Sequence, residues 1–269
     1  MSLTLAAELN YDYLKEAGFS NDKTGLSIFE NPAVINWEPL KLSVLQANKL
    51  DSQWQSNNLY LTLPFSSVKV GLSFKNDTIG NISQTYQDTD GTFKTASSFS
   101  HQKAGVILTL GQNSLVNDIC WGISNKFYYQ KLGDKSVTAF GLDAGVIYKY
   151  SDNVVTGLAL NDIAGTIFNW NDQISDCIPQ SYVYFLSLLF NPVQFSYIHN
   201  NNSPYIKGSI NLFEGLQASC KLPLQNMDQA QVALTLEYQH MQIQYEMNFN
   251  EIYAQNSLLK VSYVFGDQF

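Results

Sequence analysis

The sequence predicts an all-β fold: a single antiparallel transmembrane β-barrel of about fourteen strands, with a short N-terminal plug segment. Three observations support this prediction. Apolar and polar residues alternate with a period of two from residue 40 almost to the end of the chain. The polar face of this alternation is mostly small and uncharged, and short turns alternate with long links.

The first 38 residues do not alternate. They combine short helical patterns ("AAELNYDYLKEAG") with loop signals ("FSNDKTG", "ENPAVINWEP"). We therefore divide the chain into an N-terminal segment, residues 1–38, and a barrel, residues 39–269.

The stretch from residue 140 to 162 shows the pattern that defines the barrel strands. Phe140, Leu142 and Val146 fall on one face, and Gly141 and Asp143 fall on the other. A period of two is typical of a β-strand with one apolar face, and Ser-Asp-Asn at 151–153 is a good short turn. Similar segments lie near 40–47, 53–65, 67–76, 92–110, 116–131, 136–150, 153–161, 181–190, 193–199, 205–213, 215–222, 230–238, 240–249 and 257–266.

The apolar face could meet a protein core or lipid, and composition favours lipid. Charged residues are only 14% of the chain, against about 25% in ordinary soluble domains. Short turns (151–153, 191–192, 213–215, 239–240) alternate with long links (77–91, 162–180), as in outer-membrane barrels. We expect Val68, Val70, Phe74, Phe140, Leu142, Val146 and Leu158 to face lipid; a soluble all-β binding protein is the less favoured alternative.

Several functional classes are excluded or disfavoured. The chain has a net charge of -8 and no arginine, which argues against nucleic-acid binding. Its three cysteines and three histidines show neither a disulfide framework nor metal-ligand spacing, and no catalytic motif occurs. We expect no enzyme activity, cofactor or metal. The first residues lack the basic and apolar regions of a signal peptide, so either the protein is not exported or the sequence is a mature form with an added Met1.

The stretch "GFSNDKTGLSIFENPAVI" resembles the N-terminal plug of the FadL (long-chain fatty-acid transporter) superfamily, in which an Asn-Pro-Ala-Gly-Leu-like element precedes the first strand. Asn31, Pro32 and Ala33 match this element, and Val34 replaces the usual glycine. The segments "FGLDAGVIYKY" and "VVTGLALNDIAG" resemble strands of the PorV/PorQ branch. The Gly-rich element that usually opens such plugs is missing here.

The resemblance implies a fourteen-stranded barrel in the bacterial outer membrane with its N-terminal segment in the lumen. It implies uptake of hydrophobic small molecules or, alternatively, a non-transporting accessory or docking barrel of a type IX-like secretion system. The expected partners are outer-membrane lipid, a hydrophobic ligand or secretion-system proteins, and barrel-assembly machinery. That machinery would read the C-terminal strand, where Tyr263 and Phe265 precede the terminal Phe269.

The predicted ligand-binding residues lie in the plug and on the inner wall: Phe19, Leu26, Ile28, Phe29, Asn31, Pro32, Ala33, Lys126, Asp143 and Lys149. Asp143 and Lys149 share one face of a strand, and Lys126 lies on the preceding one. This polar group either orients a ligand head group or fixes strand register and plug position. The other assigned inward positions are mostly Gly, Ser, Asn, Gln and Lys, which disfavours a wide apolar channel.

The element Asn31-Pro32-Ala33 is expected to form a corner between plug and wall, with Asn31 extended because a proline follows it. The Asn31 side chain should cap free backbone groups in this corner. Ala33 should be small because the first strand passes close by. An ordinary loop turn is the alternative.

Overall fold

A computed structural model describes residues 26–49, 54–65, 67–89, 91–113, 118–171, 174–201, 203–225, 230–248 and 256–265. The predicted contributions of Phe19 to the plug and of Phe269 to the C-terminal signal lie outside these residues. Among the described residues, no helix has the length and apolar character needed to cross a membrane.

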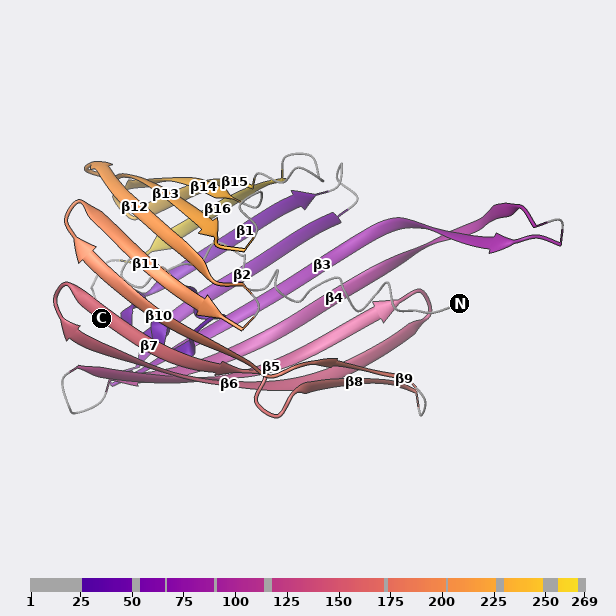
Figure 1. Cartoon of the computed structure of the whole chain (residues 1–269), viewed down its shortest axis with the longest axis horizontal. Helices are drawn as coiled ribbons and strands as arrows, with labels where there is room; N and C mark the ends of the chain where they lie inside the picture. The colour runs from indigo at the N-terminus through magenta and orange to yellow at the C-terminus, as the bar shows by residue number, and fades with distance from the viewer. Residues whose placement is uncertain are drawn as a thin grey trace.

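In the described part of the chain, fourteen strands close into one antiparallel barrel, which confirms the predicted fold class (Figure 1). Neighbouring strands follow chain order, except that β7 pairs with β10 and β1 closes the barrel against β16. The barrel strands are β1 (Lys41–Lys49), β2 (Trp54–Phe65), β3 (Val68–Gln87), β4 (Phe93–Asn113), β5 (Ile119–Leu132), β6 (Lys135–Ser151), β7 (Val154–Asn161), β10 (Ser181–Phe190), β11 (Val193–Asn200), β12 (Tyr205–Phe213), β13 (Leu216–Pro223), β14 (Gln231–Tyr238), β15 (Met241–Asn248) and β16 (Asn256–Val264).

The alternation in the sequence separates the two faces of the wall. On β6, Phe140 and Val146 are 61% and 41% exposed on the outer face, while Asp143 and Ile147 are buried on the inner face. Leu142, Leu158 and Phe74 are also exposed, and Val68 and Val70 lie half-buried on the same outer side of β3. The exterior is therefore an apolar belt of the kind that a membrane-spanning barrel presents to lipid.

The links between strands differ in length at the two ends of the barrel. We call the end that carries the turns at 152–153, 191–192, 214–215 and 239–240 the short-turn mouth, and the opposite end the long-loop mouth. At the long-loop mouth β3 and β4, with 20 and 21 residues, extend well beyond the other strands (Figure 1). The long link predicted at 77–91 is thus wrong over most of its length, because β3 continues to Gln87. Most residues of this part of β3 are polar on both faces, so the sequence shows no period of two there.

The long link predicted at 162–180 also contains regular structure. It forms a separate hairpin of β8 (Thr166–Asn171) and β9 (Ile174–Ile178) between barrel strands β7 and β10. Phe168 of β8 is buried against Tyr128, Val137 and Ala139, which are buried inward-facing residues of β5 and β6. The hairpin therefore covers the inner wall near the long-loop mouth.

Residues 26–38, which we call the luminal segment, lie inside the barrel. Asn31 leads into a 3₁₀ helix, η2 (Pro32–Trp37), and residues 26–36 are all buried. Proline suits the first position of a helix, where its missing N–H is not needed. Because η2 contacts β3, β4, β5 and β6, the segment rests against one side of the lumen.

Candidate functional site

A straight row of small residues crosses the inner wall where η2 rests. Gly111 of β4 is paired with Gly122 of β5, Gly122 with Gly145 of β6, and Gly145 with Ala159 of β7. Four adjacent strands therefore offer almost no side chain at this level. We call these four residues the glycine row.

The glycine row admits the backbone of the luminal segment. A methyl group added at Gly122 would lie 2.4 Å from the carbonyl carbon and oxygen of Pro32, and one at Gly145 would lie 2.1 Å from the Asn31 Oδ1. Contacts this short do not occur between real atoms, and at Gly122 the obstacle is backbone, which cannot move aside as a flexible side chain can. The contact between helix and wall thus requires glycine at these positions.

Asn31 connects the helix start to the wall. Its Oδ1 accepts a hydrogen bond from the Ala33 N–H at 3.0 Å, and its Nδ2 donates to the Val146 and Leu158 carbonyls, each at 3.4 Å. The residue is extended, with φ of -145°, and caps the helix, as the corner interpretation predicts. The chain does not enter the wall here but continues as η2. Ala33 lies against Gly122 of β5, and the helix contacts β3 to β6.

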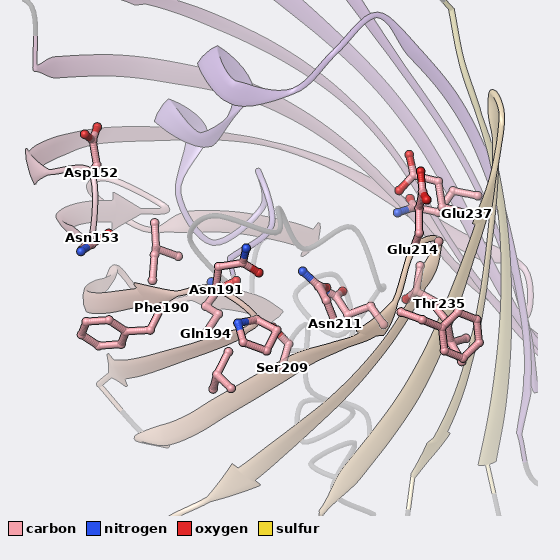
Figure 2. Close-up of a pocket in the computed structure, with 18 residues that line it drawn as sticks. Asp152, Asn153, Phe190, Asn191, Gln194, Ser209, Asn211, Glu214, Thr235 and Glu237 are labelled. Carbon is pink, nitrogen blue, oxygen red and sulfur yellow. The ribbon is translucent and has the colours of Figure 1, made fainter.

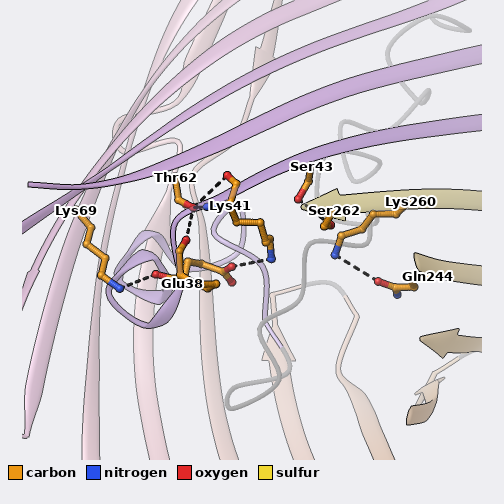
Figure 3. Close-up of polar contacts among 9 residues, drawn as sticks. Glu38, Lys41, Ser43, Thr62, Lys69, Gln244, Lys260 and Ser262 are labelled. Carbon is orange, nitrogen blue, oxygen red and sulfur yellow. Dashed lines mark hydrogen bonds and ion pairs between the residues drawn. The ribbon is translucent and has the colours of Figure 1, made fainter. Parts of the chain in front are cut away.

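Further polar contacts hold both ends of the luminal segment. The Tyr205 hydroxyl of β12 donates to Glu30, and the Asn161 Nδ2 of β7 donates to the Glu30 carbonyl at 3.3 Å. At the other end, Glu38 pairs with Lys41 at 2.8 Å and its carbonyl accepts from the Lys69 Nζ at 2.5 Å (Figure 3). The segment is therefore tied to β12 as well as to the strands that carry the glycine row.

The lumen contains an apolar cluster whose wall residues the sequence analysis did not expect. Leu26, Ile28 and Phe29 of the luminal segment belong to a buried cluster together with inward-facing residues from many strands. These wall residues include Leu45, Ile107, Ile147, Val155, Val183, Phe185, Ile198 and Leu258. The expectation of a mainly polar inner wall is thus wrong at this level, because the assigned positions lay mostly on other strands or at other heights.

Lys126 and Asp143 meet on the inner wall, together with two residues that the sequence analysis missed. The Lys126 Nζ lies 2.6 Å from the Asp143 carboxylate and 2.7 Å from that of Asp162. The Thr166 hydroxyl donates to Asp162 at 2.7 Å. This cluster joins β5 and β6 to the start of the β8–β9 hairpin and holds the hairpin against the wall. We call Lys126, Asp143, Asp162 and Thr166 the latch of the hairpin.

Lys149 does not join this cluster, which corrects the predicted grouping. It shares the inward parity of Asp143 but lies farther along β6, and six residues of strand cover about 20 Å. At the short-turn mouth Lys149 is paired with Asp152 at 2.6 Å, and this hydrogen bond holds the pKa of the Asp152 carboxyl below its usual range. Parity alone cannot show that two charges lie at different heights.

The other residues that the sequence analysis missed carried weak signals. Asp162 looked like an ordinary link residue in the sequence, and the positive φ that marks its tight turn is visible only in the structure. Glu30 lies one residue before the recognised Asn31-Pro32-Ala33 element. In each strand, the member of the glycine row lies on the same face as the buried residues. The row could therefore have been found once the strand register was known.

The described residues form a β-barrel of fourteen strands with an apolar exterior and with residues 26–38 inside its lumen. No family model matches the sequence, and no curated protein matches it. Among solved structures, the chain is similar to the toluene transporter TbuX of Ralstonia pickettii, with 8% identity, 88% of this chain and 93% of that chain covered, and a TM-score of 0.61. It is also similar to the toluene transporter TodX of Pseudomonas putida, with 11% identity, 91% and 94% covered, and a TM-score of 0.59.

A FadL homologue of Pseudomonas aeruginosa is a third similar structure, with 9% identity, 93% and 96% covered, and a TM-score of 0.53. At these identities the likeness shows the fold, and the chain therefore has the barrel fold of FadL-type proteins. The narrower resemblance to the PorV/PorQ branch stays a prediction.

Proposed function

We propose that this protein is an outer-membrane channel for hydrophobic small molecules, in which the luminal segment acts as a plug. The observation that carries the proposal is the apolar cluster inside the barrel, which the luminal segment shares with the wall. Apolar side chains in the lumen favour the passage of apolar solutes, whereas a water-filled pore has a polar interior. Similar folds in transporters of toluene support the same reading.

Orientation follows from the two mouths. In outer-membrane barrels the short turns face the periplasm and the long loops face outward. The long-loop mouth, with the β8–β9 hairpin, would then receive the ligand, and the short-turn mouth would release it. The plug lies between them.

The test is uptake into vesicles whose outer leaflet is lipopolysaccharide, with labelled toluene as the hydrophobic probe and sucrose as the polar one. Vesicles with the protein should take up toluene faster than protein-free vesicles and should exclude sucrose. Ile198→Asn places an amide in the apolar cluster and should slow toluene uptake. Gln194→Asn, on the same inner face of β11 but outside the cluster, should not.

A docking barrel is the second candidate, and the β3–β4 extension favours it. Beyond the wall this hairpin exposes Tyr86 and Phe93, which are 47% and 67% exposed. Removing residues 81–98 shortens the hairpin without touching the strands of the lumen. Unchanged toluene uptake by this variant supports the channel; uptake equal to that of protein-free vesicles by the intact protein leaves the docking barrel as the better account.

A further inference from the structure

The short-turn mouth contains a cavity that includes no residue of the glycine row and borders the apolar cluster at Leu189. Its volume is about 730 Å³, and the turns Asp152–Asn153, Asn191–Pro192 and Glu214–Gly215 form its rim (Figure 2). Strands β10 to β15 form its wall, whereas η2 rests on β3 to β6. The volume falls within the range of about 300–1,000 Å³ that small-molecule sites occupy.

The wall of this cavity is rich in hydrogen-bonding groups. Gln194, Ser209, Asn211 and Gln242 contribute amides and hydroxyls from successive strands. Figure 2 shows Asn191, Gln194, Ser209 and Asn211 along one side of the cavity, and Glu214, Thr235 and Glu237 on the other. Such a lining offers many acceptors in different directions.

Two carboxylates without a counter-charge lie together on the side of the cavity that contains Thr235. Glu214 belongs to the β12–β13 turn, and Glu237 of β14 lies beside it, since its backbone N–H donates to the Gly215 carbonyl at 2.7 Å. Within the described ranges, neither carboxylate makes an ion pair, and no lysine lines the cavity. The third acid, Asp152, is already paired with Lys149.

Thr235 provides an independent sign of a ligand. Its side chain is only 8% exposed and lines the cavity. Its hydroxyl makes no hydrogen bond to any other residue that the structure describes. The hydroxyl opens onto the cavity and is free to bind a group from outside the chain.

We propose that this cavity binds a small polyamine, a ligand with at least two primary ammonium groups. Each ammonium is a compact cation with three donors and no acceptor, which matches carboxylates, amide oxygens and a hydroxyl. A metal ion fits less well, because the described residues contain no group of three metal-ligating side chains. The site is distinct from the apolar cluster, since a hydrophobic ligand would leave Glu214 and Glu237 unpaired.

The test is isothermal titration of the detergent-purified full chain with spermidine, using sucrose and citrate as neutral and anionic comparisons. Spermidine should bind, and neither comparison should. The isosteric double variant Glu214→Gln/Glu237→Gln should weaken spermidine binding about tenfold, because exposed ion pairs are individually weak. Asp88→Asn, at the tip of the β3–β4 hairpin, is the matched control and should bind like the original protein.

A third variant separates a built site from general attraction to an acidic protein. Thr235→Val keeps the charge but removes the hydroxyl and should weaken spermidine binding severalfold. Equal affinity in all variants, or sucrose binding as strong as spermidine binding, would overturn the proposal. Toluene uptake by the Gln variants tests the hydrophobic channel separately, so the two proposals can fail independently.

Discussion

At the scale of single residues, the alternation in the sequence predicts which face of the wall a side chain lies on. Its position along the strand decides which residues it contacts. Phe140, Leu142 and Val146 lie outside, as their even positions predict, and Asp143 lies inside. The pairing of Lys126 with Asp143 could be anticipated because adjacent strands bring them together. The place of Lys149 could not, because parity carries no information about height.

The lipid-facing assignment predicts a large effect from one charge on the outer face. Leu142→Lys should lower the free energy of unfolding in lipid by about 2–4 kcal/mol, since a lysine near the bilayer midplane loses its hydration. Urea titration of the protein in phospholipid vesicles measures this. Thr138→Lys, on the same face of β6 toward the long-loop mouth, is the control and should cost far less. Equal losses in both variants would place the belt elsewhere.

At the scale of elements, strand number was predictable and the long links were not. Each of the fourteen predicted strands has a counterpart in the barrel, because its apolar face shows the period of two. The extension of β3 and the β8–β9 hairpin were read as links, since their exposed residues are polar on both sides or too few to show a period. Their positions depend on tertiary contacts such as that of Phe168 with Tyr128.

The latch of the β8–β9 hairpin gives a prediction at this scale. Lys126→Met should destabilise the protein by about 3–5 kcal/mol, because Asp143 and Asp162 would remain buried without their cation. Hydrogen exchange over residues 166–171 and 175–178 should rise in the same variant. The triple variant Lys126→Met/Asp143→Asn/Asp162→Asn should recover much of the stability.

Two results would contradict the latch. Unchanged exchange in the hairpin of the Lys126→Met variant would show that Phe168 packing alone holds it. A triple variant as unstable as Lys126→Met would mean that the loss comes from packing and not from unpaired charge.

At the scale of the whole molecule, the lumen is divided across its width. The luminal segment rests on the β3–β6 side, where the glycine row admits its backbone, and the polar cavity occupies the β10–β15 side. The presence of an N-terminal segment in the lumen was expected from resemblance to a known family. The exact position of this segment in the lumen depends on strand register, which aligns Gly111, Gly122 and Gly145 on adjacent strands.

The most direct test of a plug seated on the glycine row is single-channel conductance of Gly122→Ala in planar lipid bilayers. The added methyl would lie 2.4 Å from Pro32 backbone atoms, so the luminal segment must move and conductance should rise well above that of the original protein. Gly105→Ala is the matched control, an inward-facing glycine of β4 where a methyl finds its nearest neighbour at 3.5 Å. Its conductance should stay at the original level. If Gly122→Ala and Gly105→Ala both conduct like the original protein, residues 26–38 do not close this barrel.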